Sequence, residues 1–150
     1  MKNTEDLLQA ARRARQNAYV PYSKFAVGAA VEGVSGKVYS GRNVANASYG
    51  LCNCAERTAI FTAVAAGERQ FKAIAIIADT PGPCPPCGAC RQVIAEFKIP
   101  LITMGNLNGD CQTVSLAEIL PYGFTADELE KKSIPPVQRV ACSTAVSRYY

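Results

Sequence analysis

Two short apolar runs, each lying between helical patterns, restrict the fold of this chain more than any other feature. They are "KAIAIIAD" at 72–79 and "PLITMG" at 100–105. Neither run alternates between polar and apolar residues, and continuous apolar runs are typical of strands that are covered on both faces. The chain is therefore expected to build a sheet that helices cover.

The segments around these runs supply the other strands and the covering helices. "FAVGAAVE" at 25–32 and "KVYSGRNV" at 37–44 flank the turn "GVSG" and predict an antiparallel hairpin. Helical spacing and a short strand signal predict the remaining elements: helices over 3–18, 54–67 and 89–97, a strand after 110, and small helices near 116–120 and 125–132. This order predicts an α/β fold, a three-layer α/β/α sandwich around one mixed sheet of about five strands.

Length and charge indicate one domain followed by a basic extension. The chain has 150 residues, and we assign 1–132 to a single domain and 133–150 to a basic, flexible C-terminal tail. Residues 1–130 balance twelve Lys and Arg against twelve Asp and Glu, so the net charge of +4 comes from the four basic residues after them. A neutral body lacks the basic surface that nucleic-acid polymers require, which argues against such a partner.

The first residues and the cysteine count indicate a cytoplasmic protein that is not bound to a membrane. "MKNTEDLLQAARRARQ" has early acids and no apolar run, unlike a secretory signal. No segment reaches the roughly 18 apolar residues that a membrane span needs. Seven cysteines, an odd number, fit reduced thiols that bind metal better than they fit a set of disulfides.

The complete absence of histidine narrows the possible chemistry further. It excludes catalysis by Ser-His-Asp or Cys-His groups and every metal site that uses imidazole. Acid–base chemistry in this chain must rest on carboxylate, thiol, lysine, tyrosine or metal-bound water.

Two cysteine motifs point to one metal ion. In "PCGAC", Cys87 and Cys90 are three residues apart at the start of a predicted helix, so both sulfurs lie on one face. A helix N-terminus stabilises thiolates, and "CNCAER" at 52–57 offers a second half-site at another helix start. Three alternatives follow: a catalytic zinc site with an open position, a structural zinc with Cys52 or Cys84 as fourth ligand, or a redox dithiol. The carboxylate of Glu56 favours the catalytic zinc, because a structural site has no use for a proton shuttle.

These motifs resemble a known family. "CAE" followed about thirty residues later by "PCGAC" is similar to the zinc-deaminase signature H-x-E…P-C-x-x-C, in which three cysteines are a variant ligand set. The similarity to the small homotetrameric cytidine deaminases continues through several stretches: "VPYSKFAVGAA" (20–30), "GRNVANASYGLCNCAERTA" (41–59), "DTPGP" (79–83), "PCGACRQV" (86–93) and "ILPYGF" (119–124). It covers roughly residues 5–130.

The resemblance implies a reaction and a metal site. The reaction is the hydrolytic deamination of cytidine, 2′-deoxycytidine or modified cytidines to the uracil nucleoside and ammonia, by zinc-activated water. The Zn²⁺ ligands implied are Cys54, Cys87 and Cys90, and Glu56 is the proton shuttle. Three thiolates give the site a formal charge of −1, and Arg57 is our candidate for offsetting that charge by donating hydrogen bonds to the ligand sulfurs.

The resemblance also implies how a pyrimidine nucleoside is held. It implies that Phe25 stacks on the base, that Asn43 contacts a ribose hydroxyl, and that Ala55 offers backbone contacts to the base. Phe124 is expected to close the site from a neighbouring subunit, so the implied assembly is a homotetramer with shared active sites.

One position departs from the family pattern. Where the family has N-x-E, this chain has "NVA" at 43–45, so Ala45 replaces a carboxylate that binds the ribose 3′-hydroxyl. The departure predicts weakened or altered sugar recognition, and it keeps a blasticidin-type deaminase, which accepts a different sugar, as an alternative. A zinc-binding module without activity is a second alternative. A polynucleotide-editing deaminase is a third, against which the neutral body argues.

Overall fold

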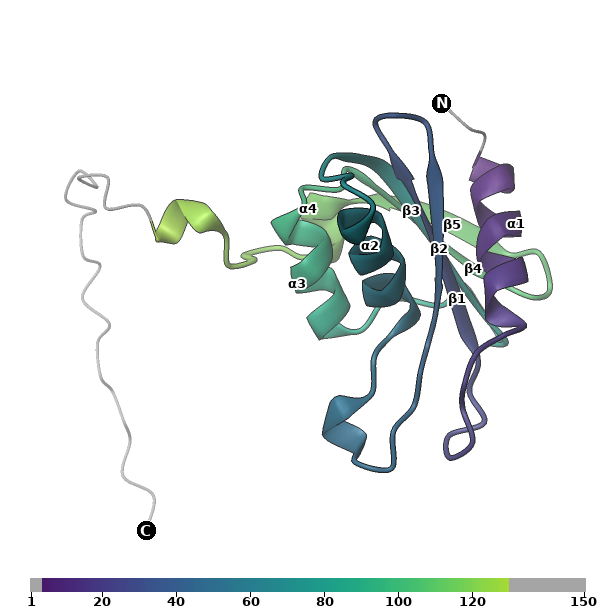
Figure 1. Cartoon of the computed structure of the whole chain (residues 1–150). Helices are drawn as coiled ribbons and strands as arrows, with labels where there is room; N and C mark the ends of the chain where they lie inside the picture. Colours follow the sequence, from purple (N-terminus) through teal and green to yellow (C-terminus); the bar gives the residue numbers. More distant parts are fainter. Residues whose placement is uncertain (1–3, 130–150) are drawn as a thin grey trace, which may run out of the picture.

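A mixed sheet of five strands forms the centre of the molecule, of which the computed structural model describes residues 4–129. The strand order is β2-β1-β3-β4-β5 (Figure 1). Strand β3 pairs parallel with β4, and the other three neighbouring pairs are antiparallel. The strands are β1 (Val27–Gly33), β2 (Val38–Arg42), β3 (Phe71–Ala78), β4 (Leu101–Asn106) and β5 (Cys111–Ser115).

Helices cover both faces of this sheet, which confirms the predicted three-layer sandwich. Figure 1 shows α1 on one face, and α2, α3 and α4 on the other. The helices are α1 (Thr4–Arg15), α2 (Ala55–Ala65), α3 (Gly88–Glu96) and α4 (Leu116–Ile119), with short 3₁₀ turns η1 (Tyr49–Leu51) and η2 (Ala126–Glu128).

The two faces of the sheet bury separate apolar clusters. Strand β1 shows why: Val27, Ala29 and Val31 point to the cluster under α2 and α3, whereas Ala30 points to the cluster under α1. Strand β3 is buried along almost its whole length because both of its faces are covered. The apolar run at 72–79 therefore gave the correct layer arrangement.

Some predicted boundaries differ from the structure. Helix α1 ends at Arg15 and not at residue 18, because residues 16–18 form tighter i−3 hydrogen bonds instead of continuing the helix. The helix predicted over 125–132 is only the 3₁₀ turn η2 within the described residues. The tail predicted at 133–150 lies outside the described residues. Within residues 4–129, no helix has both the length and the apolar character needed to cross a membrane.

At two glycines, Gly28 and Gly41, a helix lies closer to the sheet than a residue with a side chain would allow. A Cβ atom on Gly28 would lie 2.0 Å from the carbonyl oxygen of Ala11 in α1. A Cβ atom on Gly41 would lie 2.2 Å from the amide nitrogen of Ala59 and 2.3 Å from the carbonyl oxygen of Ala55, both in α2. The obstacles are backbone atoms, so they cannot move away as a side chain can. Gly41 therefore fixes how closely the start of α2 lies on β2.

This contact predicts that Gly41→Ala lowers the free energy of unfolding by ~1–3 kcal/mol, because α2 must shift to admit a methyl group. Gly82→Ala is the matched control, since nothing lies within 4 Å of a Cβ at that position. Its free energy of unfolding should stay within ~0.5 kcal/mol of the parent value. Urea denaturation of both variants measures the difference, and equal stabilities would contradict the close contact.

Candidate active site and metal centre

Three cysteine thiols meet where helices α2 and α3 begin. Cys54 is the N-cap residue of α2 and Cys87 is the N-cap residue of α3, and neither side chain is used to cap its helix. Cys90 lies in the first turn of α3. The positive ends of two helix dipoles therefore point at the thiols, which favours the thiolate form.

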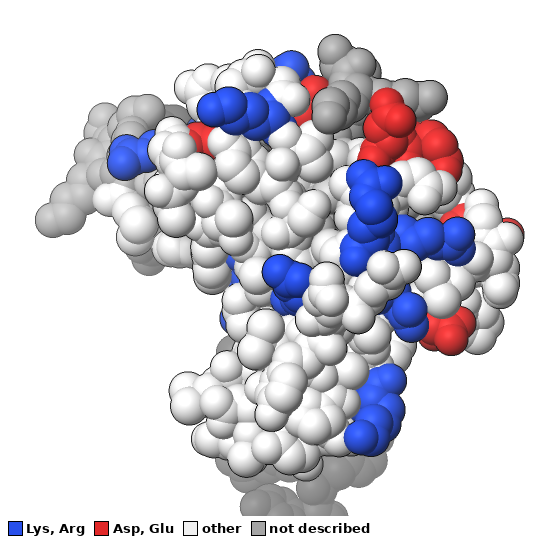
Figure 2. All heavy atoms as spheres, turned by 45° about the vertical axis from the view of Figure 1, so that its right-hand side comes forward, with Lys and Arg blue, Asp and Glu red and all other residues white. Residues whose placement is uncertain are grey.

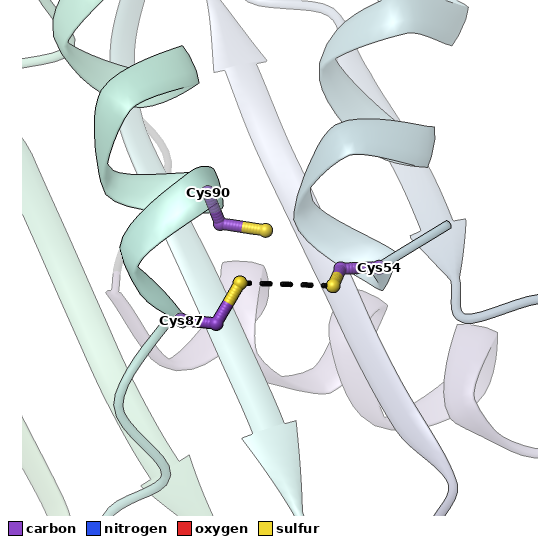
Figure 3. A group of neighbouring side chains, drawn as sticks. All are labelled: Cys54, Cys87 and Cys90. Carbon is purple, nitrogen blue, oxygen red and sulfur yellow. Dashed lines mark hydrogen bonds between the residues drawn. The ribbon is translucent and has the colours of Figure 1, made fainter. Parts of the chain in front are cut away.

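The spacing of these thiols fits one metal ion. The three sulfur atoms lie within 4.8 Å of one another, and the sulfurs of Cys54 and Cys87 are 3.8 Å apart (Figure 3). Zinc bound tetrahedrally at ~2.3 Å from each sulfur requires sulfur–sulfur distances of about 3.8 Å. The donor set therefore suits zinc, and three ligands leave one coordination position for water or substrate.

The loop before α3 is fixed from inside the chain. The guanidinium of Arg91 donates from Nε to the carbonyl oxygen of Pro86 at 2.9 Å, and from Nη1 to the carbonyl oxygen of Ile119 at 3.3 Å. These bonds hold the "PPC" turn and helix α4 against α3. The backbone just before Cys87, the N-cap residue of α3, is therefore held in place by hydrogen bonds from its own helix.

Arg57 is the cation nearest to the thiols along α2. Its Nη2 donates to the sulfur of Cys54 at 3.3 Å and to the carbonyl oxygen of Cys52 at 3.4 Å. Its Nε is buried and has no hydrogen-bond partner among the described residues. A buried donor of this kind fits a site in which a second sulfur is also a thiolate and can accept its hydrogen bond.

The pKa values of Cys54 and Cys90 are shifted in opposite directions. A hydrogen bond from the Cys90 thiol, with another from Arg57, lowers the pKa of Cys54 to about 5. The pKa of Cys90 is raised, because its thiol donates a hydrogen bond to the sulfur of Cys54 and because it is buried. Of these two, Cys54 therefore becomes a thiolate more readily.

Glu56 places a carboxylate beside the same thiols. It lies in the first turn of α2 and is only 4% exposed. Burial raises its pKa above the usual value. A carboxyl group with a raised pKa binds and releases protons more evenly near neutral pH, as a general acid–base catalyst must.

A pocket of about 370 Å³ has Cys54 in its lining, whereas Glu56, Cys87 and Cys90 are not part of that lining. Its walls come from two loops, at residues 22–23 and 43–54, and none of its lining residues is charged. Tyr22 and Tyr49 both line it and form an aromatic pair with ring centroids 6.2 Å apart. The pocket has the size of a small-molecule site.

The residues predicted to bind substrate fall into two groups. Asn43 and Ala45 line the pocket, whereas Phe25, Ala55 and Phe124 are not part of its lining. Ala55 is fully buried at the start of α2, and the residues Phe25 and Phe124 are 43% and 57% exposed. The side chain of Asn43 accepts from the amide of Val27 and donates to the carbonyl oxygen of Phe25, each at 2.8 Å, so it also holds the chain before β1 in place.

Sequence reasoning missed part of the pocket wall. Tyr22, Ser23, Tyr49 and Asn53 line the pocket. The only available signal was their position inside the two stretches similar to the deaminase family, "VPYSKFAVGAA" and "GRNVANASYGLCNCAERTA".

The other cysteines near the site do not join the metal-binding group. The sulfur of Cys52 lies 3.2 Å from the backbone nitrogen of Asn46, which donates to it. Cys84 is buried, and no fourth histidine, cysteine or carboxylate completes the group among residues 4–129. This arrangement argues against the closed four-cysteine structural site.

Comparison with known proteins agrees with this geometry. Residues 1–106 match the sequence pattern of the cytidine and deoxycytidylate deaminase zinc-binding region. The chain belongs to this deaminase family. Zinc is therefore its cofactor, and the three-thiol group is the part of the described chain that fits the ion.

Alignments with similar proteins extend over most of this chain and nearly all of each relative. A cytidine deaminase of Sporosarcina psychrophila is 50% identical over 130 residues, which is 85% of this chain and 95% of the relative. A cytidine deaminase of Halalkalibacterium halodurans is 54% identical over 126 residues, 82% of this chain and 95% of the relative. The crystal structure of a cytidine deaminase from Burkholderia pseudomallei has a TM-score of 0.80 and 51% identity, and covers 82% of this chain and 100% of that chain. The deaminase fold expected from the sequence is thereby confirmed.

The thiol geometry of this deaminase predicts which cysteines hold zinc. Cys54→Ala, Cys87→Ala and Cys90→Ala should each reduce the zinc content of the purified protein from about one ion per chain to nearly none. Cys52→Ala and Cys111→Ala are the controls and should retain the metal. Atomic emission analysis after dialysis gives the zinc content, and full zinc retention in Cys54→Ala would show that the ligand assignment is wrong.

Proposed function

We propose that this chain hydrolyses cytidine and 2′-deoxycytidine to the corresponding uracil nucleoside and ammonia. The observation that carries the proposal is that Cys54 belongs both to a three-thiol group next to the buried carboxylate of Glu56 and to the lining of a pocket without charged residues. The relatives named as cytidine deaminases support the same reaction.

Cys54, Cys87 and Cys90 would hold the zinc ion. Bound zinc supplies a Lewis acid that makes water nucleophilic near neutral pH. Arg57 offsets part of the thiolate charge through its bond to the Cys54 sulfur, and its buried Nε is available to a second sulfur. This charge compensation keeps the site electrophilic despite its three anionic ligands.

Glu56 moves the protons of the reaction. Its carboxylate takes a proton from the water that attacks C4 of the cytosine ring, and then delivers a proton to ring N3. It next carries the remaining proton to the amino group, which leaves as ammonia while the C4 carbonyl forms. The raised pKa of Glu56 suits a group that must both accept and donate.

The other predicted contacts orient the nucleoside. Ala55 is the first residue of α2, so its amide N–H has no partner within the helix and can bind the base. The exposed ring of Phe25 is free to stack on the base. Asn43 retains one N–H for a sugar hydroxyl beyond the bond that it donates to Phe25.

The active form in this proposal is a homotetramer with shared sites. The segment after α4 extends away from the body in Figure 1 and exposes large apolar side chains, among them Tyr122 and Phe124. Its contact with the body includes a hydrogen bond from Gln92 to the carbonyl oxygen of Phe124 at 2.6 Å. Apolar side chains presented in this way suit a neighbouring subunit. We place the enzyme in the cytoplasm, where the six described cysteines, all free, remain reduced.

Replacing Glu56 tests the reaction. Glu56→Gln keeps the size and polarity of the side chain but cannot shuttle protons, so kcat on cytidine should fall by ~10²–10⁴-fold. Zinc content should stay at the parent value. Loss of cytosine absorbance and release of ammonia measure turnover, and a variant with more than about a tenth of the parent kcat would contradict the proposed role. A parent chain that holds zinc but releases no ammonia would instead indicate a binding module.

Subunit mixing tests the shared site. Phe124→Ala should lower kcat/KM by ~10-fold or more, because an apolar contact with the substrate is lost. When Phe124→Ala and Glu56→Gln chains are co-expressed and purified as mixed tetramers, some sites combine an intact Glu56 with a neighbour's intact Phe124. Activity should then exceed that of either variant alone. No recovery would mean that Phe124 acts within its own subunit or not at all, and a fully active monomer in analytical ultracentrifugation would exclude shared sites.

A further inference from the structure

Cys54 begins helix α2 without the hydrogen bond that an N-cap side chain usually makes. N-cap residues are commonly Ser, Thr, Asp or Asn, whose side-chain oxygen accepts from an amide in the first turn of the helix. The sulfur of Cys54 makes no such bond and faces Cys87 and Cys90 instead (Figure 3). Other groups therefore have to fix this end of the helix if the sulfur is to remain available to zinc.

The side chains of Thr58 and Asn53 hold the backbone of this N-cap residue. Thr58 Oγ1 donates to the carbonyl oxygen of Cys54 at 3.1 Å, and the amide of Thr58 donates to the same oxygen at 3.0 Å. Asn53 Nδ2 in turn donates to Thr58 Oγ1 at 3.0 Å. The two side chains thus form a continuous hydrogen-bonded chain that runs from Asn53 through the hydroxyl to Cys54.

Asn53 is itself anchored in the loop that forms the pocket wall. Its carbonyl oxygen accepts from the amide of Val44 at 2.9 Å, and its amide donates to the carbonyl oxygen of Val44 at 3.0 Å. The loop at 43–54 lies in the lower part of the molecule in Figure 1, and charged side chains are sparse on that part of the face drawn in Figure 2. Hydrogen bonds between neutral groups therefore fix the start of α2 on the loop side.

Helix α3 repeats this arrangement at the other half of the metal site. Its N-cap residue is Cys87, whose side chain likewise makes no capping bond. Arg91 follows Cys87 by four residues, as Thr58 follows Cys54, and its Nε donates to the carbonyl oxygen of Pro86 at 2.9 Å. In both helices a side chain one turn into the helix holds the backbone at the N-cap and leaves the sulfur free.

From this arrangement we propose that Thr58 and Asn53 are positioning residues for zinc: they hold the backbone of Cys54 so that its sulfur stays directed at the ion. The inference rests on zinc as the cofactor and not on the proposed reaction, because zinc affinity is measured without turnover. Groups that orient metal ligands typically change metal affinity by ~10–100-fold when they are removed. The hydroxyl of Thr58 is such a group, since it acts on the residue that carries the ligand.

The same helix supplies a matched control. Ser and Thr side chains in helices often bond the carbonyl oxygen four residues earlier, so this type of bond does not by itself indicate a role at the metal. Thr62 makes it one turn further along α2, where its Oγ1 donates to the carbonyl oxygen of Thr58 at 2.8 Å on the exposed side. Thr62→Val therefore removes the same type of bond from the same helix without touching the N-cap.

The experiment measures the zinc dissociation constant of the full-length, zinc-loaded protein by competition with a chromophoric chelator. Thr58→Val keeps the shape of the side chain and should raise the constant by ~10-fold or more. Thr58→Ser restores the hydroxyl, and it should stay within ~3-fold of the parent, as should Thr62→Val. Circular dichroism establishes that each variant is folded. Equal constants in Thr58→Val and Thr62→Val would overturn the inference and leave Thr58 with a purely structural role.

A double variant tests whether Asn53 acts through the same hydroxyl. Asn53→Ala removes one donor, and should raise the zinc dissociation constant by ~2–10-fold. Added to Thr58→Val, it should cause no further loss of affinity, because residues of one hydrogen-bond network are not additive. Full additivity of the two losses would contradict the proposed chain from Asn53 to Cys54, and an unchanged constant in Asn53→Ala would remove Asn53 from it.

Discussion

The close contact between helix α2 and strand β2 at Gly41 is the constraint on which the site depends. Backbone atoms of Ala55 and Ala59 occupy the space where a side chain at Gly41 would lie, so the start of α2 has one position on the sheet. Cys54 and Glu56 flank the first residue of that helix and take their places from it. The carboxylate and the first thiol are thus positioned by the backbone, which is more rigid than any pair of side-chain rotamers.

The sequence predicts well those features that arise from local patterns. The apolar run at 72–79 identified a strand covered on both faces, and the three-residue spacing of Cys87 and Cys90 identified two thiols on one helical face. In each case the relevant period or spacing lies within a few residues, and no distant contact competes with it. The fold class and two of the three thiols therefore follow from local patterns, whereas Cys54, 33 residues away from Cys87, was assigned through the resemblance to the deaminase family.

The pocket wall could not be read in this way, because distant pairings shape its loops. Val44 pairs with Tyr19 on one side and with Asn53 on the other through isolated bridges. These bridges connect the two loops in which Tyr22 and Tyr49 contact each other, although 27 positions separate them in the sequence. Asn43 illustrates the same limit, since most of its side-chain bonding supports the backbone before β1. A motif shows that an asparagine is present, but it does not show which of its hydrogen bonds go to the backbone and which remain for a substrate.

The position of the thiols on two separate helices has a consequence for folding. The sulfurs of Cys54 and Cys87 are 33 residues apart in sequence. An ion that joins them acts as a cross-link, closing a loop that contains all of β3 and removing conformational freedom from the unfolded chain. In the folded chain β3 lies between the hairpin and β4, so the ligands are brought together by the complete sheet. The free energy of zinc binding therefore adds to the stability of the fold, and scarcity of zinc would reduce the quantity of folded protein as well as the activity of each molecule.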